Sequence, residues 1–455
     1  MRRRPVALLT LLAGLLAAQP AAAQLVGGGL PSVGGLPVGL PLRGLETTVE
    51  DVRTRAVRSP ADASRVLGAV SDRVEPYRRQ ARNLLRRSPD AVEPDDLGQP
   101  VVRGEVAGLG VTAAALARAR AAGFQLQTQE AIESLGLATV VLAPPRGMSA
   151  REALRRLRAL DPAGRYDLNH IYFESGGGGG AATPEPAAGG RSGRGLRIGL
   201  VDGSAATREP ALAGLQITQQ AFAPGGAKVT AHATAVASLL AGSTAGFQGA
   251  APGAALYIAD VYGPTAAGGS AMALARGLGW LARVRTPVIN VSLVGPRNAV
   301  LEAAVEALVA RGYILVAAVG NDGPGAAPLY PAAYPGVVAV TGVDARRRVL
   351  PEAGRGAHVA FAAPGADMVA ASASGGFTGV RGTSFAAPLA AARLAELSPA
   401  PDPVGAARAI EALGREAADL GAPGRDPVYG RGLVAADLAV RPSALAAQGP
   451  GSRPR

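Results

Sequence analysis

Short, nearly all-apolar runs alternate with helical stretches through the second half of the chain. The runs with the length of a buried strand cover residues 196–201, 255–261, 288–293, 314–319 and 337–340. The helical stretches between them include residues 234–240, 271–284 and 300–310. Buried strands that alternate with helices are typical of a parallel sheet covered on both faces. The pattern therefore predicts an α/β region over residues 196–440 with a doubly wound, mostly parallel sheet.

A different rhythm precedes this region, in residues 101–175. The pattern reads strand, helix, strand, strand, helix, strand, over residues 101–109, 112–122, 124–132, 138–142, 149–160 and 166–173. This order is that of a small α+β, ferredoxin-like split βαβ unit, which needs a partner surface. Residues 176–195 are rich in Gly, Ala, Pro and Ser, and they predict a mobile, cleavable linker.

The N-terminus reads as a secretory signal peptide over residues 1–23. Arg2, Arg3 and Arg4 precede an apolar stretch, and Ala21-Ala22-Ala23 fits a cleavage site. An uncleaved membrane anchor is the alternative, but the small residues after Pro20 favour cleavage. We therefore expect a secreted or periplasmic protein that keeps no membrane attachment.

The flanking segments carry little information. Residues 24–100 begin as a flexible Gly/Pro-rich stretch, and one or two helices are expected over 45–87, with a role that the sequence does not indicate. Residues 441–455 read as a disordered tail.

Composition narrows the classes of function. The 455 residues contain no Cys, which excludes disulfides and thiolate metal sites. The net charge of +12 comes almost entirely from Arg, which could indicate nucleic-acid binding. However, the Arg residues are scattered and aromatic residues make up only 4%, so we expect no nucleic-acid partner. No acidic cluster has the spacing of a calcium site, so we predict no cofactor and leave structural calcium open.

Ser384 is the first candidate for chemistry. It lies between a turn at Gly382 and a helix expected over residues 385–397. Its backbone N–H is then one of the unpaired donors of a helix N-terminus, where the macrodipole is positive. That position suits a nucleophile whose attack creates an oxyanion. Taken alone, a serine at such a position is more commonly a helix cap.

A serine nucleophile needs a base and a carboxylate that orients the base. After the linker the chain has two histidines, His232 and His358, and His232 stands at the start of an apolar helix. Asp202 follows the apolar strand 196–201, and the carboxyl ends of parallel strands meet at the active-site edge. The alternatives are a helix-capping histidine and a turn-capping aspartate.

In the order Asp202, His232, Ser384, these motifs resemble the subtilisin-like serine proteases. Further segments resemble that family in their residues and in their order along the chain: 288–293, 317–323, 330–342 and 361–365. The resemblance covers about residues 195–440. It implies a serine endopeptidase that acts on polypeptides and needs no metal for its chemistry.

The resemblance also implies a role for each residue. Ser384 attacks the scissile carbonyl, His232 takes its proton, and Asp202 holds the imidazole of His232. Asn321 and the Ser384 N–H bind the oxyanion. The expected substrate-binding residues are Ser292, Leu293, Val294, Val319 and Gly320.

Three residues depart from the family pattern. Ala233 stands beside the base where Gly is usual. Val294 stands where Gly is common, and Val319 where Ala is usual. If both valines line the primary specificity pocket, the pocket is narrower, and small or medium side chains are preferred before the scissile bond over large aromatic ones.

Residues 101–175 resemble the family's N-terminal propeptide, which assists folding and caps the active site as an intramolecular inhibitor. The segment 167–172 resembles its last strand, which makes His170 structural. We therefore expect a zymogen that cleaves itself within or near residues 175–195.

Two alternatives of other classes remain. The chain could be a catalytically silent binding module, but all of Asp202, His232, Asn321 and Ser384 are present. It could be an esterase, but esterases with this triad usually carry a G-x-S-x-G elbow with the serine first, whereas Ser384 comes last here.

Overall fold

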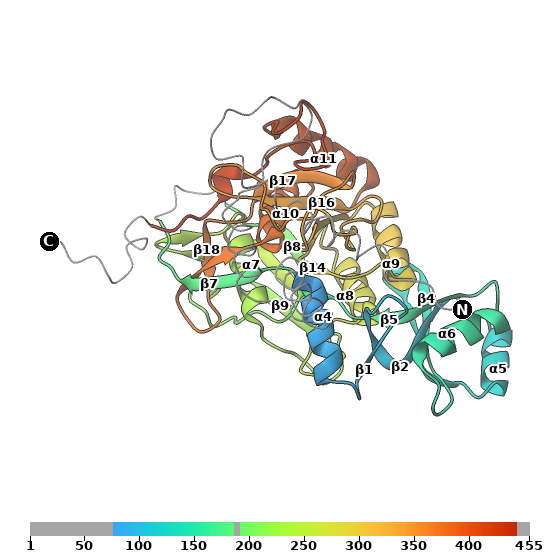
Figure 1. Cartoon of the computed structure of the whole chain (residues 1–455). Coiled ribbons are helices and arrows are strands. Elements are labelled where there is room, and N and C mark those ends of the chain that lie inside the picture. The colour runs from blue at the N-terminus through green and yellow to red at the C-terminus, as the bar shows by residue number, and fades with distance from the viewer. Residues whose placement is uncertain (1–75, 186–191, 444–455) are drawn as a thin grey trace, which may run out of the picture. The chain divides into compact units, whose positions relative to one another are not determined.

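The computed structural model of the chain describes residues 76–185 and 192–443 (Figure 1). The signal peptide expected over residues 1–23, the segment 24–75 and the tail from residue 444 lie outside the described residues. All described residues belong to one compact unit, Leu67–Arg455. Within the described ranges, no helix is both long and apolar enough to cross a membrane.

A seven-stranded sheet forms the centre of the C-terminal region, in the order β17-β16-β15-β13-β8-β12-β9. Every neighbouring pair is parallel. The strands are β8 (Arg197–Asp202), β9 (Ile217–Ala221), β12 (Ala255–Asp260), β13 (Val288–Val291), β15 (Ile314–Ala318), β16 (Val338–Val343) and β17 (Val359–Pro364). The predicted α/β fold with a mostly parallel sheet is confirmed.

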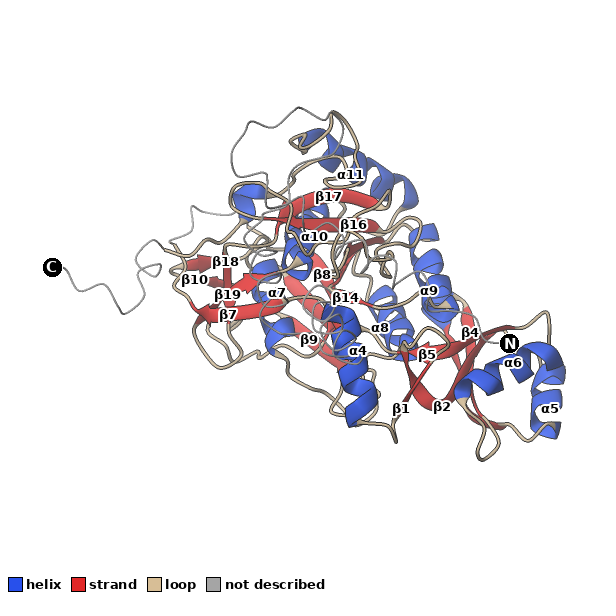
Figure 2. Ribbon diagram, viewed as in Figure 1, coloured by secondary structure: helices blue, strands red, loops and turns tan. Residues whose placement is uncertain are grey.

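Helices cover both faces of this sheet (Figure 2). They are α7 (Ala231–Ala241), α8 (Ala271–Arg283), α9 (Ala299–Ala310), α10 (Thr383–Leu397) and α11 (Pro403–Glu416). Alternate strand residues point to opposite faces. On β8, Leu200 joins the apolar cluster with α7 and α10, whereas Val201 joins the cluster with α8 and α9. Burial on both faces explains why the inner strands are largely apolar, whereas the edge strand β9 alternates between half-buried and exposed residues.

The chain leaves β8 toward β9 and β12 on one side and later returns to β13 on the other side. In sheets of this kind, binding crevices form at the carboxyl ends of strands where the order reverses. Asp202 is the last residue of β8, so it stands at that point.

The N-terminal unit is an antiparallel sheet with two helices. Its strands are β1 (Val92–Pro94), β2 (Pro100–Leu109), β3 (Gln125–Ile132), β4 (Leu137–Ala143) and β5 (Arg165–His170). Its helices are α5 (Ala113–Ala121) and α6 (Ala150–Leu160). β2 lies between β5 and β4, and β4 also pairs with β3, which is the ferredoxin-like order expected from the sequence. The caps Thr112 and Ser149 each accept a hydrogen bond from the first turn of the following helix.

This unit does not bury its sheet alone. Ala107, Leu109 and Val141 belong to the same apolar cluster as α8 and α9. On β5, Asp167 Oδ2 accepts a hydrogen bond from Ala299 N at 2.7 Å, and Asn169 Oδ1 accepts one from Met272 N at 3.1 Å. Two polar side chains of β5 thus satisfy backbone donors at the starts of α9 and α8, where a negative charge is favourable.

Six further elements supply residues that line a pocket of about 640 Å³. They are α4 (Pro76–Arg87), β6 (Phe173–Glu174), β7 (Gly177–Ala181), β14 (Leu293–Val294), β18 (Met368–Ala371) and β19 (Phe377–Arg381). The short strands β10 (Ser243–Thr244) and β11 (Phe247–Gln248) form a separate hairpin.

Candidate active site

The structure brings the predicted base and carboxylate together. His232 Nδ1 lies 2.8 Å from Asp202 Oδ2, although the two residues are 30 positions apart. Asp202 Oδ1 accepts a second hydrogen bond from Gly203 N at 2.8 Å. Asp202 is completely buried, so both carboxylate oxygens are used and their orientation is fixed. His232 is the second residue of α7, whose N-cap Thr230 accepts a hydrogen bond from Ala233 N.

The electrostatics of this pair follow from its burial. Burial by itself lowers the pKa of His232, but the charge of Asp202, the hydrogen bond with it and the charge of Glu174 raise the pKa to about 9. The imidazolium form of His232 is therefore stabilised at neutral pH.

Ser384 is the second residue of α10 and is fully buried. Gly382, the residue before this helix, has φ 140°, and a Cβ there would lie 3.0 Å from Gly176 Cα and 3.2 Å from Asn321 Nδ2. Only glycine fits both the backbone conformation and the space. The Ser384 Oγ and the His232 Nε2 are both buried without a hydrogen-bond partner. The ring of Phe385, the residue after Ser384, lies 5.4 Å from the His232 ring.

Asn321 is held in one orientation. Its Oδ1 accepts a hydrogen bond from Thr383 N at 3.1 Å, which leaves its Nδ2 as a donor on the other side. Thr383 Oγ1 in turn accepts a hydrogen bond from Gly320 N at 3.2 Å. The start of α10 and the segment after β15 therefore position the Asn321 amide together.

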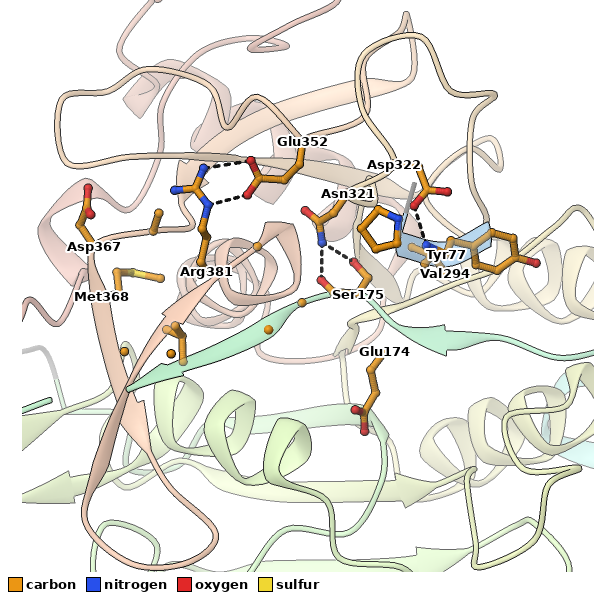
Figure 3. Close-up of a pocket in the computed structure, with 18 of the residues that line it drawn as sticks. Tyr77, Glu174, Ser175, Val294, Asn321, Asp322, Glu352, Asp367, Met368 and Arg381 are labelled. Atoms are coloured by element: carbon orange, nitrogen blue, oxygen red, sulfur yellow. Dashed lines mark hydrogen bonds and ion pairs between the residues drawn. The ribbon is translucent and has the colours of Figure 1, made fainter. Parts of the chain in front are cut away.

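Both predicted oxyanion donors point at the same atom, the carbonyl oxygen of Ser175; Figure 3 shows the bond from Asn321. Asn321 Nδ2 donates to it at 2.7 Å, and Ser384 N donates to it at 3.3 Å. The Ser384 Oγ lies next to the same peptide unit, because a Cβ added to Gly176 would collide with it. The peptide bond between Ser175 and Gly176 is therefore beside the predicted nucleophile, with its carbonyl oxygen at both predicted oxyanion donors.

The chain on both sides of this bond is held as an extended strand. Before the bond, β6 pairs antiparallel with β14, and Ser175 N donates to Ser292 O at 3.3 Å. After the bond, β7 pairs antiparallel with β19. The first part of the stretch that we expected to be a mobile linker is therefore an ordered strand.

The predicted substrate-binding residues lie in three places. Ser292, Leu293 and Val294 run beside residues 173–175, as just described. Val294 Cγ1 is 3.5 Å from the point where a Cβ on Gly320 would lie, so it partly covers Gly320. Val319 is 2% exposed and packs in the apolar cluster with α8 and α9, below the groove surface.

This site is bordered by two features to which the sequence analysis assigned no role. Helix α4 lies over residues 173–175: Tyr77 N donates to Asp322 Oδ1 at 2.7 Å, and the Tyr77 ring packs edge-on against Phe173 at 5.5 Å. Gln80 Nε2 donates to Glu174 O at 3.5 Å. The helical pattern was readable in the sequence, but these contacts join residues up to 245 positions apart, and nothing local indicated them.

Glu174 is the second such feature. Its side chain points away from Asn321 and Asp322, on the other side of the strand (Figure 3). Potential ligand atoms of Glu174, Asp202 and His232 lie within 4.8 Å of one another, which is the spacing of a metal site. His232 Nδ1 is already bonded to Asp202, and Glu174 belongs to the segment that carries the peptide bond at the nucleophile. Among the described residues, this group therefore joins the predicted base, the predicted orienting carboxylate and a side chain of the strand that pairs with β14.

Comparisons with known proteins agree with this geometry. A sequence model described as the subtilase family matches residues 216–432, which include His232, Asn321 and Ser384. The chain is 32% identical to subtilisin Savinase of Lederbergia lenta, over 56% of this chain and 95% of that protein. It is 30% identical to subtilisin DY of Bacillus licheniformis, over 56% of this chain and 94% of that protein.

Two further relatives are longer than the matched region. The chain is 28% identical to the minor extracellular protease Epr of Bacillus subtilis, over 57% of this chain but only 40% of that protein. Among solved structures, fervidolysin of Fervidobacterium pennivorans superposes with a TM-score of 0.62 at 20% identity, over 75% of this chain and 61% of that chain. At this identity, the superposition supports the fold only.

Proposed function

This chain belongs to the subtilase family and contains a serine endopeptidase domain of the subtilisin type, and we propose that it is made as an exported zymogen that cleaves its own Ser175–Gly176 bond. The observation that carries the proposal is the Ser175 carbonyl oxygen, which accepts hydrogen bonds from both Asn321 and Ser384 N. A substrate carbonyl must occupy this place for its oxyanion to be stabilised.

The proposed reaction uses the chain's own side chains. Ser384 Oγ forms a bond to the Ser175 carbonyl carbon while its proton passes to His232 Nε2. The proton then passes to the Gly176 nitrogen as the peptide bond breaks, which leaves Ser175 esterified to Ser384. Water attacks this ester, gives a proton to His232, and returns the hydroxyl to Ser384. No step requires a metal or another cofactor.

The same contacts support the proposal that the protease is inactive toward other substrates before it is cleaved. Residues 76–175 supply α4, the ferredoxin-like unit and β6, and together these fill the cleft on the Ser175 side of the bond. The N-terminal part is thus an intramolecular inhibitor before cleavage, and afterwards the new C-terminus at Ser175 keeps these contacts until the cleaved part dissociates or is degraded. Other polypeptides then become substrates.

The endopeptidase function is tested by labelling the chain, after self-cleavage, with a fluorophosphonate and by adding a peptide with the sequence of residues 171–179. We expect one label, on Ser384, and hydrolysis of the peptide between Ser and Gly. Absence of both would identify a silent binding module. Labelling together with hydrolysis of simple esters, but not of any peptide, would identify an esterase.

The burial of Ser175 gives a prediction for P1, the residue before the proposed scissile bond. Ser175 is 4% exposed, and its Oγ lies 3.4 Å from both Thr383 Oγ1 and Asn321 Nδ2. Overpacking a filled site costs about 1–3 kcal/mol. We expect Ser175→Phe to slow self-cleavage about 10-fold to 100-fold and Ser175→Ala to leave the rate nearly unchanged, both followed by gel densitometry. Equal or faster cleavage of the Phe variant would show that the pocket is wide.

The raised pKa of His232 gives a prediction for pH. Only the neutral imidazole accepts the Ser384 proton, so self-cleavage should be slow at neutral pH and accelerate as the pH rises through about 9. Glu174→Gln removes one of the two negative charges that raise this pKa, so the midpoint of the rate profile should move to lower pH. The rate is measured from pH 6 to 10, with exposed Glu306→Gln as the matched control. A midpoint that stays in place, or rises, in Glu174→Gln contradicts this account.

A further inference from the structure

The side chain of Glu174 lines a pocket close to His232. The pocket has a volume of about 370 Å³, and its other polar lining residues are Gln80, Lys228, Thr230 and Tyr262. Glu174 is P2, the second residue before the scissile bond, and its backbone pairs with Leu293. The P2 side chain of any substrate bound in the same register enters this pocket.

Thr230 offers a hydroxyl donor to the pocket. Its Oγ1 accepts a hydrogen bond from Ala233 N at 3.0 Å, so one lone pair is used and the O–H remains available to donate. A hydrogen bond from this hydroxyl to the Glu174 carboxylate works against the burial that raises the pKa of Glu174. The N-cap of α7 therefore recognises a P2 acceptor as well as the first turn of its own helix.

Tyr262 provides a second donor. Its hydroxyl is buried without a hydrogen-bond partner, which is uncommon for a buried polar group. Burial, followed by the nearby charges of Glu174, Asp202 and Asp260, raises the pKa of Tyr262 well above its usual value. The phenol therefore stays protonated and can only gain from an acceptor on the P2 side chain.

Lys228 places a positive charge at the rim. It is the only lysine of the chain, and its side chain is exposed. Its backbone is fixed on both sides, because its N–H donates to Asp260 Oδ2 at 2.6 Å and its carbonyl accepts from Ser204 N at 2.9 Å. Two hydroxyl donors and one cation in the same pocket match a carboxylate, and the Lys228 charge repels a positively charged P2 side chain.

We propose that this pocket is the S2 subsite, which receives the P2 side chain, and that it selects acidic side chains. The protease then preferentially cleaves polypeptides that have Glu at P2 and a small residue at P1. The proposal rests on the endopeptidase function proposed above and names its substrate class. Glu174 and Ser175 of the chain itself are the first example of the motif. A P2 carboxylate also lies close to His232, where positive charge develops during the reaction, so it favours the transition state as well as binding.

The test compares three peptides with the sequence of residues 171–179, carrying Glu, Gln or Lys at P2. The enzyme is the full chain after self-cleavage, and the pH is 9.5, above the pKa of His232, so that the base is mostly neutral. We expect kcat/KM to be about 10-fold higher for the Glu peptide than for the Gln peptide, because hydrogen bonds to charged groups are the stronger ones. The Lys peptide should be cleaved more slowly than either.

Substitutions of residues that line the pocket test whether these residues cause the preference for an acidic P2 side chain. Lys228→Glu should reverse the order of the Glu and Lys peptides, and Tyr262→Phe should reduce the Glu-to-Gln ratio. Arg346→Glu makes the same change of charge at an exposed residue outside the pocket and should leave all three ratios unchanged.

The outcomes separate this inference from the proposed function. Equal kcat/KM for the Glu and Gln peptides, or faster cleavage of the Gln peptide, overturns acid selectivity while the endopeptidase stands. A chain that neither cleaves itself nor hydrolyses any of the peptides, and that takes no fluorophosphonate label, overturns the endopeptidase function itself.

Discussion

Ser384→Ala is expected to abolish both self-cleavage and peptide hydrolysis, with a loss of about 10⁶-fold, the size of loss seen when a subtilisin loses this hydroxyl. The substitution removes the atom that attacks the Ser175 carbonyl, and the Asn321 side chain and the residue-384 N–H remain as oxyanion donors. Because Ser384 Oγ makes no hydrogen bond, its removal leaves no partner unsatisfied and the fold should be unaffected.

The measurement is hydrolysis of the residue 171–179 peptide together with the intact mass of the purified chain. Ser374→Ala, which removes the hydroxyl of an exposed serine on the β18–β19 turn, is the matched control and should process normally. Hydrolysis by Ser384→Ala within 10-fold of the control rate would show that another group is the nucleophile.

Asp202→Asn is expected to lower kcat by about 10⁴-fold while the chain stays folded. Asp202 Oδ1 accepts from Gly203 N, and Oδ2 accepts from His232 Nδ1. An amide at this position must keep its oxygen toward Gly203 N, which turns its NH₂ group toward Nδ1. His232 Nδ1 then becomes an acceptor, its proton moves to Nε2, and the imidazole can no longer accept the Ser384 proton.

The rate is measured on the same peptide at pH 9.5, with Asp437→Asn at an exposed position as the control. A loss below 10-fold would mean that Asp202 only packs beside the base. A loss of secondary structure by circular dichroism would instead show that the buried carboxylate is needed for folding.

Most of the parallel sheet could be predicted because its inner strands are buried on both faces, whereas the partly exposed edge strand β9 was not predicted. Runs such as 196–201 and 288–293 contain little but apolar residues, and this composition is what a parallel sheet between two helical layers requires. The helix starts were also local properties. Ser149 caps α6 through its own side chain, and Gly382 permits the backbone conformation before α10.

The position of the N-terminal segments could not be predicted from the sequence, because it depends on contacts between residues far apart in the chain. Residues 177–181 are Gly-rich, and such a sequence has no preference for a strand; the edge of β19 supplies the hydrogen bonds that hold it as one. The contact of Tyr77 with Asp322 is likewise invisible in either local sequence. Val319 looked like a pocket residue, whereas the structure packs it into the apolar cluster beneath.

The same reasoning applies to the site. Family order identified the candidate residues Asp202, His232, Asn321 and Ser384, but no sequence feature distinguished one bond within 175–195 as the target. Only the geometry, in which two donors converge on the Ser175 carbonyl, selects one peptide bond. The carboxylate of Glu174 beside His232 emerged in the same way, from the register of β6 on β14.

The central claim is tested most directly by N-terminal sequencing of the purified chain after incubation at pH 9.5, beside Ser384→Ala treated identically. We expect a new N-terminus at Gly176 in the wild-type chain and no new N-terminus in the variant. A cut at another bond would contradict the assignment of the scissile bond, and the same cut in Ser384→Ala would show that the chain does not cleave itself.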